Sequence, residues 1–227
     1  MKKIAMAIGL GLLSLSCASK KDNIIAIDVL LTPSEEMNAH AIQLNELIKQ
    51  NNPETISLDK NHIPHITLLQ AYIKKSDLQK VRRLLHGLYD DIKDENLKAK
   101  SISYNKEEKE SFAMITIEKS EQLLNLHKKT IDLVKPFMVD QGTENSFVQN
   151  PDGSAISEST VSYVSEFVEK HSYENFDPHI SLGVADTVVL DSLTKNVFKP
   201  MSFKAPSISL YKLGDHGTAQ KPLWRSE

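Results

Sequence analysis

Two short segments with nearly the same sequence lie in opposite halves of the chain. Residues 64–68 read PHITL and residues 178–182 read PHISL. Proline suits the first position of a strand because it fixes φ and has no N–H to pair. Side chains alternate between the faces of a strand, so each histidine shares a face with the Thr or Ser two residues later, and the Ile and Leu share the other face. The chain therefore predicts two matched strand starts, each with an apolar pair for the core and an imidazole and a hydroxyl opposite.

The rest of the chain alternates short β-branched stretches with longer amphipathic stretches, in a similar order in both halves. This order indicates a duplicated lobe of strands and helices, and hence an α+β protein. Polar residues with Gly and Pro mark a long surface loop at 140–154, which is a candidate lid. Predicted strands are 24–31, 56–58, 65–71, 97–104, 112–118, 179–184, 198–203 and 208–213, and predicted helices are 33–50, 76–89, 120–134, 157–170 and 190–196.

The first 18 residues are expected to be an export signal rather than part of the fold. Lys2 and Lys3 precede an apolar run at 4–15 that is shorter than a membrane-spanning helix and is followed by small residues. Cys17, the only cysteine of the chain, ends a segment that resembles a bacterial lipobox. That resemblance implies a lipid on Cys17 and a membrane-anchored envelope lipoprotein. Cleavage after Ala18 would instead give a free periplasmic protein, and both outcomes stay open.

The charge of the chain excludes one class of function. The formal net charge is −3 and the isoelectric point about 6.3, so the chain is not a strongly basic protein that coats nucleic acid without sequence preference. A small phosphate ligand needs only a local binding pocket, which the net charge does not exclude.

If the two predicted lobes face each other, two imidazoles and two hydroxyls converge. Histidine titrates near neutral pH, so one ring is able to take a proton while the other gives one. His65 and His179 would then activate a water or hydroxyl and protonate a leaving oxygen, in an order that the sequence does not decide. Thr67 and Ser181 would donate hydrogen bonds to the non-bridging oxygens of a phosphate.

Two H-x-[ST] strand starts in a chain of this length resemble the 2H phosphoesterase superfamily, which includes bacterial RNA 2′,5′-ligase-like proteins and cyclic nucleotide phosphodiesterases. The resemblance implies a bilobal α+β domain over 23–214, with two antiparallel sheets, flanking helices and a central cleft, before an irregular tail at 215–227. It implies a monomer that cleaves a 2′,3′-cyclic or 2′,5′ phosphodiester of a nucleotide or short RNA without a metal or other cofactor. By position, His65 and His179 match the catalytic pair, and Thr67 and Ser181 match the phosphate-holding hydroxyls.

Other readings of the same residues stay open. One alternative is that the two motifs are ordinary strand starts whose histidines cap neighbouring backbone. Another is that the chain is an envelope lipoprotein that binds a nucleotide or phosphate with little or no turnover. Tyr72 and Tyr211 end predicted strands and are candidates to contact substrate, against the ordinary role of a half-buried strand tyrosine. His216, between two glycines, is a weaker pocket candidate. His40, His86 and His127 are expected to be surface or internally satisfied residues, and His171 is expected to interact with the dipole at a helix C-terminus.

Overall fold

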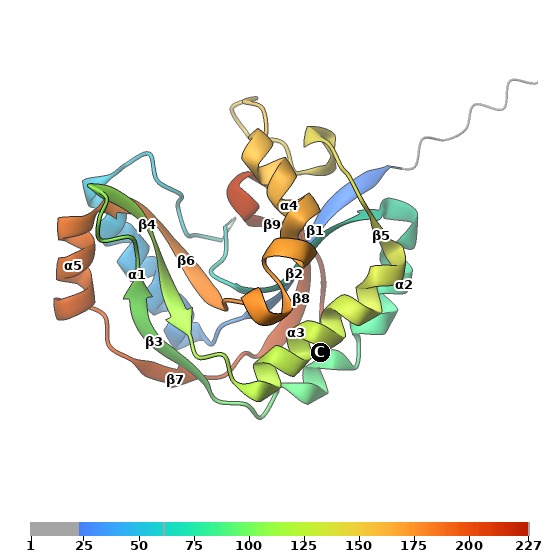
Figure 1. Cartoon of the computed structure of the whole chain (residues 1–227), viewed down its shortest axis with the longest axis horizontal. Helices are drawn as coiled ribbons and strands as arrows, with labels where there is room; N and C mark the ends of the chain where they lie inside the picture. The colour runs from blue at the N-terminus through green and yellow to red at the C-terminus, as the bar shows by residue number, and fades with distance from the viewer. Residues whose placement is uncertain (1–22, 61, 227) are drawn as a thin grey trace, which may run out of the picture.

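The computed structural model describes residues 23–60 and 62–226, so the expected signal segment and Cys17 lie outside the described residues. Two antiparallel sheets with helices packed against them form this part of the chain, which confirms the predicted α+β class (Figure 1). One sheet has the order β5-β2-β1-β8-β9, formed by β5 (Met138–Val139), β2 (Ile66–Lys74), β1 (Ile24–Thr32), β8 (Ser207–Leu213) and β9 (Ala219–Arg225). The other has the order β6-β4-β3-β7, formed by β6 (His179–Asp186), β4 (Glu110–Ile117), β3 (Leu97–Ser103) and β7 (Met201–Phe203).

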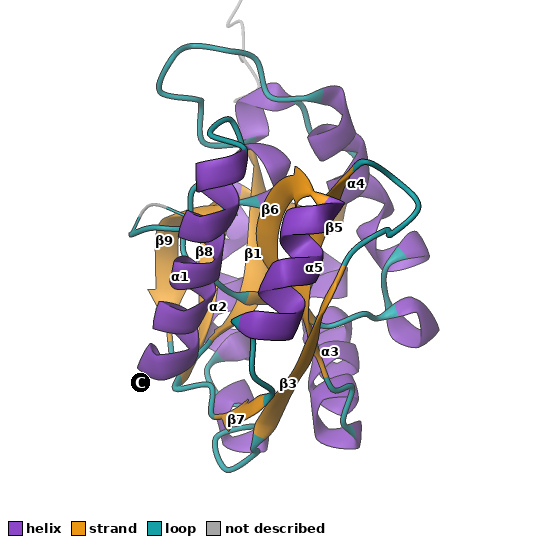
Figure 2. Cartoon of the chain, turned by 90° about the vertical axis from the view of Figure 1, so that its left-hand side faces the viewer, coloured by secondary structure: helices purple, strands orange, loops and turns teal. Residues whose placement is uncertain are grey.

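Two of the helices each pack on the sheet opposite the one that contains the preceding strand. Helix α1 (Glu35–Asn51) follows β1 but packs on β6 of the other sheet, and α3 (Glu121–Val134) follows β4 but packs on β2. Helix α4 (Glu158–Lys170) also packs on β2, α2 (Leu78–Leu85) packs on α3, and α5 (Thr187–Asn196) packs on the four-stranded sheet. Figure 2 shows α1 and α5 together in front of the strands. One continuous core of buried residues consequently joins both sheets.

Serine caps fix where the three longest helices begin. The side chain of Ser34 accepts a hydrogen bond from the N–H of Met37, and Ser120 and Ser157 cap α3 and α4 in the same way. Such caps satisfy backbone donors that the first turn leaves unpaired. The cap at Ser157 matters most for the site, because α4 covers β2.

The two motif strands carry the same backbone irregularity. Pairing between β1 and β2 shifts at Leu68, and pairing between β4 and β6 shifts at Leu182. Each bulged leucine stands three residues after the motif histidine. A β-bulge turns the following residues to the opposite face from that expected for a regular strand. The predicted alternation therefore holds from the histidine to the hydroxyl residue and changes phase beyond it.

Three local predictions were wrong. Residues 56–58 are not a strand, because the side chain of Asn45 bonds their backbone: its Nδ2 donates to the Ile56 carbonyl at 2.7 Å, and its Oδ1 accepts from the Leu58 N–H at 2.8 Å. The strand expected at 198–203 is only Met201–Phe203. The tail predicted to be irregular from residue 215 contains β9, which pairs with β8 at the edge of its sheet. Pro222 is compatible with this position, because an edge strand tolerates proline.

Between residues 23 and 226, leaving out residue 61, no helix combines the length and the apolar character needed to cross a membrane.

Candidate active site

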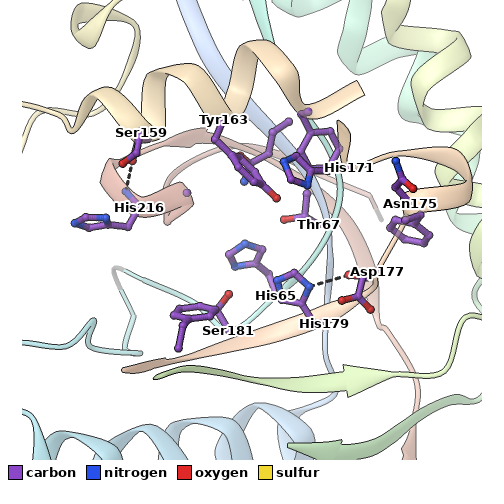
Figure 3. Close-up of a pocket in the computed structure, with 16 residues that line it drawn as sticks. His65, Thr67, Ser159, Tyr163, His171, Asn175, Asp177, His179, Ser181 and His216 are labelled. Atoms are coloured by element: carbon purple, nitrogen blue, oxygen red, sulfur yellow. Dashed lines mark hydrogen bonds between the residues drawn. The ribbon is translucent and has the colours of Figure 1, made fainter. Parts of the chain in front are cut away.

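A cavity of about 420 Å³ lies between the two motif strands and α4 (Figure 3). His65 and Thr67, at the start of β2, line it together with His179 and Ser181 at the start of β6. The four sequence-predicted catalytic positions thus come from both sheets and face one space.

Both motif histidines are oriented by the same backbone contact. Nδ1 of His65 lies 2.8 Å from the Ile63 carbonyl oxygen, and Nδ1 of His179 lies 2.7 Å from the Asp177 carbonyl oxygen. A carbonyl only accepts, so Nδ1 carries the hydrogen and donates it, and Nε2 is the nitrogen left for other chemistry. In each case the accepting carbonyl belongs to the residue before the motif proline. The histidines therefore do cap neighbouring backbone, but with one nitrogen only.

Asp28 is a residue of the site that the sequence analysis missed. It is completely buried, and its Oδ2 lies 3.5 Å from Nε2 of His65. The same oxygen accepts hydrogen bonds from Oγ1 of Thr67 at 2.9 Å and from Nε2 of Gln70 at 3.1 Å. The bulge at Leu68 brings Thr67 and Gln70 to one face of β2, opposite Asp28. A single carboxylate within the β-branched run of residues 24–31 was the available signal, because unpaired charges are rarely fully buried.

The surroundings of the two histidines shift their pKa values in opposite directions. Burial lowers the pKa of His65, but the hydrogen bond and negative charge of Asp28, helped by the Ile63 carbonyl, outweigh burial and raise the pKa above its usual value. Burial lowers the pKa of His179, the carbonyl and charge of Asp177 oppose the fall, and the charge of His65 adds to it, so the pKa ends below its usual value. Of the two rings, His65 consequently holds a proton more readily and His179 gives one up more readily.

The two motif hydroxyls are in different states. Thr67 donates its single hydroxyl hydrogen to Asp28. Among the described residues, the hydroxyl of Ser181 has no hydrogen-bond partner, and it faces the cavity. The expected pair of equivalent phosphate donors is thus unequal before a ligand binds.

Aromatic rings form another part of the cavity wall. Tyr163 from α4 stacks on His171, with ring centroids 4.4 Å apart and an interplanar angle of 27°. Phe112 from β4 also lines the cavity, and both Tyr163 and Phe112 keep more than a third of their surface exposed. Burial raises the pKa of Tyr163, and the charges of Asp28 and Asp177 raise it further, so its hydroxyl stays protonated. Exposed aromatic faces of this kind are suited to stack on a flat ligand group.

His216 lines the cavity from the turn between β8 and β9, so this candidate does lie at the site (Figure 3). Its backbone is in the left-handed region, at φ 54° and ψ 28°. The N–H of His216 donates to Oγ1 of Thr160 at 2.9 Å and to Oδ1 of Asp215 at 2.9 Å. Burial raises the pKa of Asp215, but donors from Thr160, Ser157 and His216 outweigh it and bring the pKa to about 2. This ionised carboxylate holds the strained turn against the start of α4.

The two tyrosines predicted to contact substrate do not line the cavity. Tyr72 is 1% exposed, its hydroxyl donates to the Val161 carbonyl at 3.0 Å, and its ring packs against Phe147. Tyr211 is partly buried on β8, between Asp28 of β1 and Pro222 of β9 in the sheet, and is also absent from the cavity wall. Both tyrosines have the ordinary role of a strand residue. Helix α4 and the segment 140–154 cover Tyr72, and β9, which was not predicted, pairs with β8 beside Tyr211.

The segment 140–154 gives the lid prediction no support. Its Phe147 is 1% exposed and belongs to a small core cluster with Tyr72, and Gly142 lies so close to the Tyr72 ring that a Cβ there would clash with it. No residue of the segment lines the cavity. The packing shows a segment anchored beside α4.

His127 on α3 is an internally satisfied histidine, as expected, and it links the two motif regions. Its Nδ1 lies 2.7 Å from the Leu68 carbonyl of β2, and its Nε2 accepts the N–H of Tyr173 at 3.0 Å. The imidazole also stacks on Phe176, with centroids 3.9 Å apart. Burial lowers its pKa to about 4, although the Leu68 carbonyl opposes the change. The neutral ring thereby joins the bulge of β2 to the loop that leads into β6.

Other histidines lie away from the chemistry. His62 does not line the cavity and contacts Nε2 of Gln220 at 3.0 Å. His40 stacks near Phe198, and His86 is exposed at the end of α2. In the part of the chain that the structure describes, no three His, Cys, Asp or Glu side chains gather in a way that would hold a metal ion.

Comparison with known proteins gives similarity at the level of solved structures. No protein-family model matches the chain, and no curated protein matches it. Escherichia coli LigT in its apo form is 14% identical over 89% of this chain and 96% of its own, with a TM-score of 0.46. TT0787 of Thermus thermophilus is 14% identical over 89% of this chain and 97% of its own, with a TM-score of 0.49, and a structure described as a phosphoesterase is 12% identical over 88% and 96%, with a TM-score of 0.45. The chain is similar to these structures along most of its length. The identities and TM-scores are too low to assign a role to any side chain, so the chemistry is argued from the cavity itself.

Proposed function

We propose that this protein is a phosphodiesterase of the 2H type, which uses His65 and His179 as an acid–base pair. One observation supports the proposal above the others. Two imidazoles, each with Nδ1 held by a backbone carbonyl, line the same cavity from separate sheets, in environments that shift their pKa values in opposite directions. Pairs of titratable groups whose surroundings separate their pKa values are typical of acid–base catalysis.

The opposite pKa shifts support a division of roles between the two histidines. Neutral His179 takes a proton from the attacking water, whose oxygen forms a new bond to phosphorus. Protonated His65 gives a proton to the ester oxygen as the bond between that oxygen and phosphorus breaks. The products are a phosphomonoester and a free hydroxyl, and the pair is restored by exchange of the protons with solvent. Ser181, which lines the cavity, donates a hydrogen bond to a non-bridging oxygen, where negative charge accumulates.

The proposed substrate is a 2′,3′-cyclic or 2′,5′ phosphodiester of a nucleotide or short RNA. A cavity of about 420 Å³ is within the usual size of small-ligand sites. The exposed faces of Tyr163 and Phe112 supply surfaces for a base. The resemblance of the two motifs to those of the 2H phosphoesterase superfamily supports the same class. If residues 1–18 are an export signal and Cys17 is lipidated, the substrate is one found outside the cytoplasm.

The test is hydrolysis of a 2′,3′-cyclic nucleotide by the mature protein in the presence of a chelator. His65→Ala and His179→Ala should each lower kcat by ~10²–10⁴-fold, the usual contribution of a general acid or base. His62→Ala is the matched control, since His62 lies three residues before His65 but outside the cavity, and it should keep full activity. Circular dichroism would confirm that all variants fold. Full activity in both cavity variants, or loss of wild-type activity on adding chelator, would overturn the mechanism.

The alternative is a nucleotide- or phosphate-binding protein with little turnover. Tight binding of the cyclic nucleotide with no product after hours, at any pH between 5 and 8, would favour this alternative over the phosphodiesterase.

A further inference from the structure

The near symmetry of the two motif strands is broken at the positions five residues after each histidine. Five residues after His65, Gln70 on β2 pairs with Asp28 on β1. Five residues after His179, Val184 on β6 pairs with Phe112 on β4. The register therefore places a completely buried carboxylate in one half where the other half has an aromatic ring that is 43% exposed.

Asp28 is held in a way that costs stability. Its Oδ2 has three neighbours, Thr67, Gln70 and His65, but its Oδ1 has no hydrogen-bond partner within the described residues. Transfer of an ionised carboxylate out of water is unfavourable unless hydrogen bonds or an opposite charge compensate it. The Thr67 and Gln70 donors are neutral groups. The opposite charge that this site offers is the imidazolium form of His65.

We propose that Asp28 is a positioning residue that makes the two histidines unequal, by holding His65 in its protonated form and so assigning it the role of acid. The role of His65 as acid rests on the proposed function. The contact itself, a buried carboxylate 3.5 Å from Nε2 of one motif histidine and not of the other, is a property of the free protein. Thr67 and Gln70 fix the carboxylate in place through hydrogen bonds to the same oxygen.

Several other titratable groups face the cavity, and their positions support this assignment. Tyr163 comes from α4 and His171 from its C-terminal end, Asp177 and His179 from the start of β6, and His216 from the turn after β8. Asp177 is the carboxylate that lines the cavity, and its charge acts on His179 and Tyr163. It is exposed to solvent, which screens its charge, whereas Asp28 is not. Asp28 is therefore the stronger local influence, and it acts on His65.

The first experiment measures protonation without turnover. NMR titration of the imidazole resonances in the free protein, assigned by the signals that disappear in His65→Gln and His179→Gln, gives both pKa values. His65 should titrate at a higher pH than His179 in the unaltered protein. Asp28→Asn, which keeps the size and an accepting oxygen but removes the charge, should lower the pKa of His65. Asp177→Asn is the matched control: it should lower the pKa of His179 and leave His65 nearly unchanged.

The second experiment reads the same change in the pH profile. With His65 as acid, kcat/KM falls on the alkaline side as His65 loses its proton and on the acid side as His179 gains one. Asp28→Asn should move the alkaline limb to lower pH, and each unit of movement lowers kcat/KM on that side about tenfold. The acid limb should stay in place. A merely structural role for Asp28 would lower kcat/KM at all pH values together.

Two failures can be told apart. If the pKa of His65 lies below that of His179 in the unaltered protein, or is unchanged by Asp28→Asn, the inference about Asp28 is wrong whether or not the protein is an enzyme. If the titrations agree but no diester is cleaved at any pH, the proposed function fails while the charge contact stands. Should Asp28→Asn not fold, the titration of the unaltered protein still decides the first point.

Discussion

Protonation of His127 should be a main cause of acid destabilisation of this fold. The ring is completely buried, donates from Nδ1 to the Leu68 carbonyl and accepts from the Tyr173 N–H at Nε2. A second proton has to go on Nε2, where the Tyr173 N–H already points. The folded protein therefore binds this proton only after its hydrogen bond is broken, which agrees with a pKa of about 4.

The size of the effect follows from the two pKa values. In the unfolded chain a histidine titrates near 6.5, whereas folded His127 titrates at about 4. As the pH falls below 6.5 the unfolded state takes up the proton and the folded state does not, so the free energy of unfolding decreases until about pH 4. A gap of about 2.5 units corresponds to roughly 3 kcal/mol. Since domains are commonly stable by about 5–15 kcal/mol, one histidine would remove a large part of the total.

The measurement is the free energy of urea unfolding, followed by the fluorescence of Trp224, the only tryptophan. His127→Gln keeps an acceptor for Tyr173 but cannot titrate. At pH 7 the variant should be less stable, by about 1–3 kcal/mol, because the Leu68 carbonyl loses its donor. Between pH 7 and pH 4 the difference from the unaltered protein should shrink by roughly 3 kcal/mol, since only the unaltered protein loses the His127 contribution.

A second variant on the same helix supplies the control. Leu126→Ala truncates a buried side chain and should cost about 2–5 kcal/mol, with no titrating group removed. Its difference from the unaltered protein should not vary with pH. If the His127→Gln difference is equally constant, the buried ring does not stay neutral in the fold, and the reasoning from its two hydrogen bonds is wrong.

Three further predictions concern residues around the cavity. Asp215→Asn should lower the free energy of unfolding at pH 7 by about 2 kcal/mol, because the pKa of Asp215 is about 2 in the folded protein and 3.8 in the unfolded chain. This contribution is complete above the unfolded pKa and is lost as the pH falls toward 2, so urea unfolding at pH 7 and pH 3 measures it. Tyr72→Phe should cost about 1 kcal/mol through the lost bond to Val161 and leave kcat/KM unchanged, which thermal melts and steady-state kinetics check. Ser181→Ala should weaken binding of inorganic phosphate, measured by calorimetry, more than Thr67→Val does, and equal losses would show that Thr67 turns from Asp28 to the ligand.

Features that depend on residues close together in the chain could be predicted from the sequence. Proline before histidine, and a hydroxyl two residues later, predict both strand starts and the face that each histidine shares with its hydroxyl, because these depend on strand periodicity and on residues close in the chain. The three serine-capped helices were predictable for the same reason. The convergence of the four side chains also required the two halves to face each other, as they do in the structure.

What the sequence did not reveal depends on contacts between distant segments. Asp28 joins the site because β1 pairs with β2, and Tyr72 leaves it because Phe147 and α4 cover the ring. Strand β9 forms because β8 offers an open edge, which local propensity around Pro222 does not show. Such outcomes are set by tertiary pairing, which overrides local preference.

In this protein, features repeated in both halves set the positions of the two imidazoles, whereas a residue present in only one half sets the difference in their charged surroundings. Each half repeats the proline, the carbonyl contact to Nδ1 and the bulged leucine, and these repeated features place two imidazoles alike. Acid–base chemistry needs the rings to differ, and the repeated residues cannot supply a difference. It comes from the neighbouring strand, where one half has Asp28 and the other Phe112 at the equivalent register. If the two imidazoles act as acid and base as proposed, a single residue outside the motif suffices to make them differ, and substitutions at that position should alter the pH dependence before they alter the arrangement of the site.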